Sequence, residues 1–156
     1  MVKSYNPNNP TTIQLLQNGT TIDTVSIPAE TGSGQVTQEF SFSNVLAGTY
    51  SLKITKDAHT PYLINNIVIT DTDVDLTQDS RDGVRLISLL CGDVNNDGVI
   101  NVNDLNTVWA NQNYGKAVQA AQNPLCDLNG DGVINVNDLN ILWSSTNYGK
   151  GAIVIN

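Results

Sequence analysis

The sequence has few charged residues, and basic ones are the scarcest. Charged residues make up 14% of the chain, seven Lys and Arg face fifteen Asp and Glu, and the formal net charge is −8. Proteins that bind nucleic acids or anionic membrane surfaces usually present basic patches. The composition therefore argues against both kinds of partner.

Long apolar runs, histidine and cysteine are also scarce. No apolar run approaches the roughly 18 residues of a membrane-spanning helix, so we expect no direct membrane contact. One His and two Cys leave nucleophilic catalysis without its usual side chains. Glu30 and Glu39 would be a glycosidase pair only beside a deep cleft, which a small β-rich region does not provide. We expect no catalytic residues, and no enzyme.

In the first half of the chain, apolar and polar residues alternate along several short stretches. Hydrophobic residues make up 40% of the 156 residues, enough for one medium domain or two small ones. Apolar residues alternate with polar ones along 50–54, and shorter stretches around Phe40–Phe42 and Ile67–Ile69 show the same pattern. Turns such as Asn18-Gly19 separate these stretches. Short strands between glycine-bearing turns predict an all-β sandwich.

The second half contains an internal repeat that carries all of its acidic residues. Residues 93–116 and 127–150 are identical at 17 of 24 aligned positions. The six Asp residues after Cys91 occupy positions 1, 5 and 12 of two twelve-residue segments, 93–104 and 127–138. Ordinary solubilising carboxylates would be scattered, so these six are expected to share a specific task.

The segment D-x-N-x-D-G-x-I-N-x-x-D is typical of a calcium loop. Ca²⁺ takes six to eight oxygen ligands from side chains, main-chain carbonyls and water. Glycine at position 6 permits the sharp turn, and position 7 contributes its carbonyl. The predicted ligands are Asp93, Asn95, Asp97, Val99, Asn101 and Asp104 in the first loop, and Asp127, Asn129, Asp131, Val133, Asn135 and Asp138 in the second. A metal-free, Asx-rich turn is the alternative, but two complete copies favour calcium.

Two Ca²⁺ ions would neutralise this half, which carries six Asp and two Lys. We therefore expect folding coupled to binding.

Each loop is followed by apolar residues at helical spacing, which predict a helix that ends near Gly115 or Gly149. Pro124 argues against a helix entering the second loop, so these are EF-hand-like loop–helix units without the entering helix. Ile100 and Ile134, at position 8, are expected to pair the loops across a core.

Paired loop–helix calcium repeats of this kind resemble the dockerin family, over 91–156. The stretch 44–56 followed by Ile67-Val68-Ile69 resembles the β-sandwich X-module that precedes type II-like dockerins, a relative of carboxypeptidase-regulatory-like and transthyretin-like sandwiches. The resemblance implies an X-module over 1–89 and a small all-α dockerin over 90–156. No flexible linker separates them, so we expect the two modules to pack together.

The resemblance also implies a function. Dockerins bind cohesins on scaffoldins or cell-surface anchoring proteins, in the extracellular cellulosomes that degrade plant polysaccharides. An X-module next to a dockerin commonly stabilises it. The expected function is non-catalytic, calcium-dependent assembly, with two Ca²⁺ as cofactors. The alternative is a carbohydrate-binding or adhesion sandwich with a calcium-stabilised appendage.

Cohesin contacts in the family come from loop positions 10 and 11 and the outer face of the following helix. Here these positions hold Val102, Asn103, Asn106, Trp109 and Ala110 in the first copy, and Val136, Asn137, Asn140, Trp143 and Ser144 in the second. Val-Asn and Trp depart from the Ser/Thr pair and basic residues common in type I dockerins, which favours a more apolar, type II-like interface. Each Trp is either such an anchor or a core residue, and two equivalent faces suggest two binding orientations.

Cys91 and Cys126 lie just before the two loops. In an extracellular module they either form a disulfide, which would close a 36-residue span, or stay as two buried thiols. The sequence leaves both alternatives open.

Overall fold

The computed structural model describes all 156 residues. Its first part is mainly β-structure. The strands are β1 (Val2–Tyr5), β2 (Thr11–Gln17), β3 (Thr20–Ile27), β4 (Gln35–Gln38), β5 (Gly48–Lys56), β6 (Ala58–His59), β7 (Tyr62–Ile69) and β8 (Ile87–Ser88), with a 3₁₀ turn η1 (Leu76–Gln78) before β8. The second part begins with the strand β9 (Cys91–Asp93) and has two short helices, α1 (Val102–Trp109) and α2 (Val136–Leu142), two 3₁₀ turns, η2 (Val118–Ala120) and η3 (Pro124–Cys126), and the final strand β10 (Ile153–Ile155).

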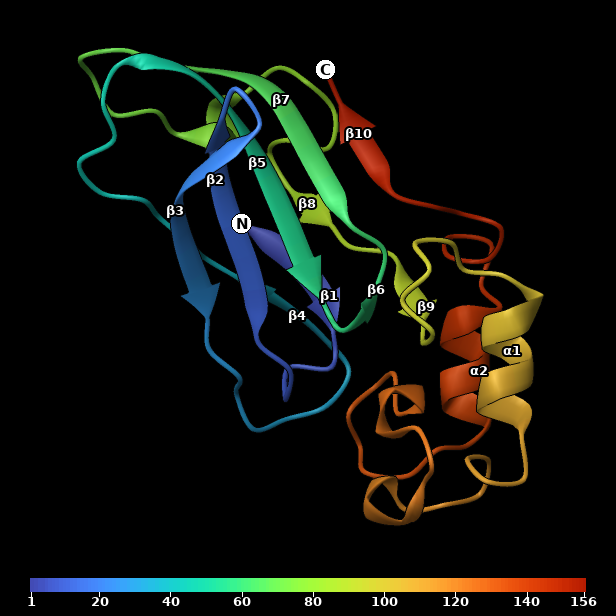
Figure 1. Cartoon of the computed structure of the whole chain (residues 1–156). Coiled ribbons are helices and arrows are strands. Elements are labelled where there is room, and N and C mark those ends of the chain that lie inside the picture. The colour runs from blue at the N-terminus through green and yellow to red at the C-terminus, as the bar shows by residue number, and fades with distance from the viewer.

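Two sheets enclose the first core (Figure 1). The larger sheet has the order β10-β7-β5-β2-β3 and the smaller one β4-β1-β8. Alternation along β5 turns Tyr50, Leu52 and Ile54 inward, as predicted, and they pack with Val2 and Ile87 of the small sheet. The hairpin between β2 and β3 turns at Asn18-Gly19, both with positive φ (50° and 79°), as two-residue hairpin turns require. A mainly β first part followed by two short helices is thus confirmed.

Two expected strands differ in the structure. Phe40 and Phe42 lie in irregular chain and pack against the core. Their two rings meet each other edge-to-face, with centroids 6.3 Å apart. The apolar run before the first loop forms only the two-residue strand β8, followed by β9. The chain must leave the small sheet at this point, because β9 pairs with β6 in a separate two-stranded ribbon.

The second part has its own core, and α1 and α2 lie side by side within it (Figure 1). Val108 and Leu142 are fully buried there, together with Ile100 and Ile134. Ala58, from β6, belongs to this same core, so the first part supplies some of its packing. None of the helices is long and apolar enough to cross a membrane.

Three attachments join the two parts. β6 pairs with β9, the β1–β2 connection reaches the second loop, and β10 adds a parallel strand to β7. Residues 153–155, which the sequence assigned with the C-terminal module, therefore complete the sheet of the N-terminal one. Ile153 contacts both cores. The expectation that the modules pack together agrees with these contacts.

His59 is buried at the first attachment and is held neutral by its neighbours. Its Nε2 accepts a hydrogen bond from the Tyr5 main-chain N–H (3.2 Å), so Nδ1 carries the proton and donates to the Asp57 carbonyl (2.8 Å). Burial lowers the pKa of His59 from 6.5 to about 4, with nearby Lys56 lowering it further and the Asp57 carbonyl opposing the shift. A protonated ring would point an N–H at the Tyr5 N–H.

This depressed pKa predicts acid sensitivity between pH 6.5 and 4. In that window the unfolded chain binds a proton at His59 and the folded chain does not, so stability falls as the pH is lowered, by up to about 3 kcal/mol. Urea unfolding at a series of pH values checks this, with His59→Gln as the comparison. The pH slope should be steeper in the parent; equal slopes would contradict the prediction.

Candidate metal loops and the outer helix faces

Each twelve-residue segment is a closed loop held by its own carboxylates. In the first, the Asp93 carboxylate accepts hydrogen bonds from the N–H groups of Asp97 (3.0 Å) and Gly98 (2.9 Å). Asn95 accepts from Asp97, and Asp97 from Val99. The bonds to Asn95 and Asp97 are Asx turns, in which a short side chain bonds the main chain two residues on. The second loop repeats the pattern from Asp127 onward, except that Asp127 accepts from the Gly130 N–H (2.9 Å) and not from that of Asp131.

Position 12 is the most buried part of each loop. Asp104 and Asp138 have no exposed surface. Asp138 accepts main-chain hydrogen bonds from Leu128 (2.8 Å), Asn129 (3.2 Å) and Asn135 (2.8 Å). It thereby joins the start of the loop to the start of α2, where it forms a capping box with Asn135. Asp104 does the same for α1.

Burial raises the pKa of Asp138, against three main-chain donors that lower it. Burial likewise raises the pKa of Asp93, where the N–H of Gly98 opposes the shift and the neighbouring Asp104 adds to it. Desolvated carboxylates that repel one another are stabilised by a bound cation. The electrostatics of both loops therefore fit a metal ion.

The donor chemistry of the loops fits calcium. Each loop offers carboxylate, amide and main-chain oxygens, the hard ligands that Ca²⁺ prefers. The three carboxylates of a loop do not form a group that would hold a metal by themselves, so an ion there also depends on the Asn side chains and the position-7 carbonyl. Gly98 and Gly132 have φ values of 88° and 90°, the positive values that the turn at position 6 requires.

Each loop pairs with the end of the other repeat, which differs from the expected pairing of Ile100 with Ile134. The Ile100 N–H donates to the Lys150 carbonyl (2.8 Å) and its carbonyl accepts from Gly149 (2.8 Å). Ile134 is bound in the same way by Lys116 and Gly115. Both Ile side chains enter the shared core. The two repeats are therefore interlocked.

The helices end earlier than predicted, at Trp109 and Leu142. Buried Asn113 ends α1: its Nδ2 donates to the Thr107 carbonyl (2.8 Å) and its Oδ1 accepts from the Asn123 N–H (2.8 Å). Asn147 does the same between Ile141 and Cys91. Sequence reasoning missed these two residues, although their identity in both copies of the repeat was a signal.

The outer helix faces carry exposed apolar side chains. Trp109 and Trp143 are 59% and 57% exposed, so neither is a core residue. Each packs against a tyrosine of its own repeat, Tyr114 or Tyr148, with ring centroids 4.6 and 4.4 Å apart and ring planes tilted by 39° and 42°. Val102 and Val136, at the helix starts, are also about half exposed. Of the other residues predicted to contact a cohesin, Asn103, Asn106, Asn137 and Asn140 are exposed, and Ala110 and Ser144 are half-buried.

Both cysteines are free and buried in the second core, the second of the two alternatives. The Cys91 thiol faces the Leu128 carbonyl at 3.9 Å. Burial raises the pKa of Cys91, and raises that of Cys126 to about 12. Both thiols are therefore protonated and unreactive at neutral pH.

Comparison with known proteins agrees with this architecture. Residues 91–144 match the family model of the dockerin type I domain. The repeat-bearing part of the chain is therefore a dockerin domain, a class of domain that generally binds calcium. No curated protein sequence gives a significant match.

The whole chain shares its fold with chains from two crystal structures of a type II cohesin–X-dockerin complex from Acetivibrio cellulolyticus. One complex is a C-terminal interface mutant (TM-score 0.63) and the other an N-terminal interface mutant (TM-score 0.60). In both, the identity is 23% and the match covers 96% of each chain. The likeness shows a common fold.

The interlocking role of Asn113 predicts a stability loss in Asn113→Ala. The substitution leaves the half-buried Asn123 N–H without a partner and leaves the Thr107 carbonyl only the long hydrogen bond from the Ala110 N–H (3.4 Å), which should cost about 2 kcal/mol. Urea unfolding measures this, with Asn111→Ala, an exposed neighbour that makes no side-chain hydrogen bond, as the control. A loss no larger than that of the control would contradict the assigned role.

Proposed function

We propose that the chain is a non-catalytic, calcium-dependent assembly module whose dockerin binds a cohesin. The observation that carries this proposal is the pair of equivalent apolar faces on the helices, Val102 with Trp109 and Val136 with Trp143, each about half exposed. Exposed Trp and Val on a small domain are typical of a protein interface. The solved complexes of the same fold are cohesin–X-dockerin complexes.

The domain assignment belongs to this proposal. We assign 1–89 to an X-module related to transthyretin-like sandwiches and 90–156 to the dockerin, with two EF-hand-like loop–helix repeats. Each loop would hold one Ca²⁺ through its six predicted ligands. We propose that the module acts outside the cell, in a cellulosome or at the cell surface.

The cohesin type is a further part of the proposal. Apolar Val and Trp stand where many type I dockerins have Ser/Thr and basic residues, and they favour a type II-like partner. The carbohydrate-binding alternative gains no support from the β-sandwich, because Tyr50 and Tyr62 are buried and Phe40 and Phe42 pack on the core. No exposed aromatic platform remains there for a sugar ring.

Calcium should be required both for folding of the dockerin and for binding. We expect tight binding to a type II cohesin by calorimetry in calcium, and no measurable binding after chelation, because the loops support the helix starts. Far-UV circular dichroism of the free protein should lose helical signal on chelation. An unchanged spectrum, or binding that persists in chelator, would contradict calcium dependence.

Substitutions on the two faces test the interface. If either face can bind, Val102→Ala with Trp109→Ala should weaken binding only about twofold, as should Val136→Ala with Trp143→Ala. All four together should weaken it about 30-fold or more, since buried Trp anchors are typical hot spots. Leu46→Ala, an exposed X-module residue (80%), is the control. A large loss from one face alone would indicate a single orientation, and no loss from all four would rule out these faces.

A further inference from the structure

The β1–β2 connection of the X-module lies directly on the second metal loop. Asn6 Nδ2 donates to the Asp127 carbonyl (2.8 Å), and Asn8 Nδ2 donates to the Gly130 carbonyl (2.8 Å). Between them, the Gly34 N–H donates to the Asn129 carbonyl (2.6 Å). Three hydrogen bonds from the X-module thus hold positions 1, 3 and 4 of this loop, two of which carry predicted calcium ligands.

The donors are themselves fixed. Asn6 is 8% exposed, and its Oδ1 accepts from the Asn8 N–H (3.2 Å). Asn8 bonds both main-chain groups of Gly32, through Nδ2 to the carbonyl (2.9 Å) and through Oδ1 from the N–H (3.3 Å). One side chain therefore ties the β3–β4 connection to the metal loop. We call Asn6 and Asn8 the asparagine clamp.

The clamp fits only because position 4 of the second loop is glycine. A Cβ on Gly130 would lie 2.6 Å from both Asn6 Oδ1 and Asn8 Nδ2, closer than real contacts allow. Position 4 of the first loop is Asn96, an exposed residue. The two loops differ only at positions 2 and 4, and at position 2 both residues, Val94 and Leu128, are buried apolar ones. The two loops therefore differ in chemistry only at position 4, which in the second loop is the position that the X-module contacts.

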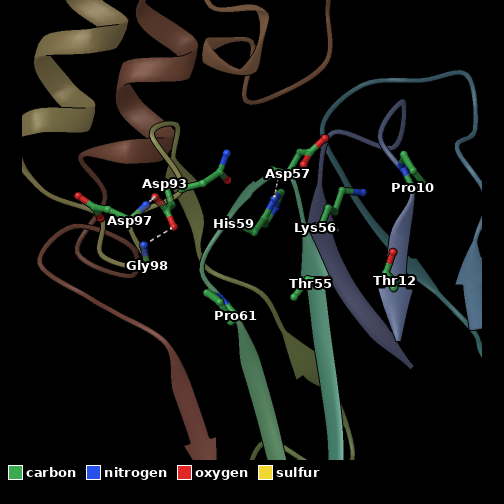
Figure 2. A pocket seen from close by; sticks show the side chains of 11 residues that line it. Pro10, Thr12, Thr55, Lys56, Asp57, His59, Pro61, Asp93, Asp97 and Gly98 are labelled. Carbon is green, nitrogen blue, oxygen red and sulfur yellow. Dashed lines mark hydrogen bonds between the residues drawn. The ribbon is translucent and has the colours of Figure 1, made fainter. Parts of the chain in front are cut away.

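The first loop is supported differently. Its contact with the X-module is the β6–β9 ribbon, which pairs Ala58 with Asp93 and ends there. Beyond Asp93 the loop borders an open polar pocket that Asp97 and Gly98 line together with His59 (Figure 2). Residues 95–97 are exposed there, whereas Asn129 and Gly130 are half-buried. Beyond position 1, the X-module therefore holds the second loop and not the first.

We propose that the asparagine clamp positions the ligands of the second loop, so that this loop binds calcium more tightly than the first. Ordering a loop opposes ion binding, and a loop that is already ordered loses less entropy. Linkage makes the effect reciprocal: calcium in the second loop strengthens the contact between the modules by the same factor. The proposal rests on calcium binding by the loops, as proposed above.

Calcium calorimetry on the full chain tests the inference, with one loop disabled at a time. Asp93→Ala with Asp97→Ala leaves only the second loop, and Asp127→Ala with Asp131→Ala leaves only the first. Asn8→Ala should weaken calcium binding about tenfold in the first background and less than twofold in the second. Asn9→Ala is the matched control, because its side chain makes no hydrogen bond. Equal effects in both backgrounds, or none in either, would overturn the proposal.

A swap of position 4 gives a second, independent test. Gly130→Asn gives the second loop the residue of the first and should weaken its calcium binding at least as much as Asn8→Ala. Asn96→Gly, the mirror change, should have little effect on the first loop. If Gly130→Asn binds calcium like the parent, the clamp does not position the ligands.

Hydrogen exchange separates positioning from a general loss of stability. Calcium added to the parent should increase amide protection in residues 5–9 and 31–36 of the X-module, and Asn8→Ala should remove that increase while the central strands β2 and β5 stay protected. Unchanged protection in these segments would overturn the linkage. Absence of any calcium binding by the parent would instead refute the proposed function.

Discussion

The carboxylates of Asp104 and Asp138 have no contact with solvent, and a buried carboxylate must find compensation for its charge. Each obtains it from three main-chain N–H groups, two at the start of its loop and one at the N-cap of its helix. The loop therefore has to close on itself and the helix has to begin where it does. Through this requirement the metal loops fix the direction of α1 and α2, and with it the position of the exposed Trp on each.

The two repeats also depend on each other for main-chain hydrogen bonds. Gly149 and Lys150, from the end of the second repeat, hold Ile100 of the first, and Gly115 and Lys116 hold Ile134. Asn113 and Asn147 add a bond from each helix end to the chain ahead of the opposite loop. These contacts explain why the Asn-Tyr-Gly-Lys sequence recurs in both copies. Its residues act on the partner repeat, so their role is invisible within one copy.

The sequence predicted what depends on local chemistry. The inward face of β5, the turn at Asn18-Gly19 and the helix in each repeat follow from alternation, turn residues and apolar residues at helical spacing. It did not predict what depends on distant partners: the helix ends set by Asn113 and Asn147, the addition of β10 to β7, or the bonds from Asn6 and Asn8 to the second loop. The exposure of Trp109 and Trp143 was left open for the same reason, because a helical stripe does not say where the core ends.

The X-module breaks the symmetry of the dockerin. The outer faces of α1 and α2 are equivalent in residue type and exposure, yet the loops beneath them are not, because the asparagine clamp touches only the second. A partner that binds either face would contact the same apolar side chains, but only the face on α2 would lie next to a loop that the X-module holds. If the second loop takes up calcium first, its helix start is ordered first, and at limiting calcium the face of Val136 and Trp143 is the one presented. The duplication would then supply two similar surfaces, and the X-module would determine which of them forms more readily.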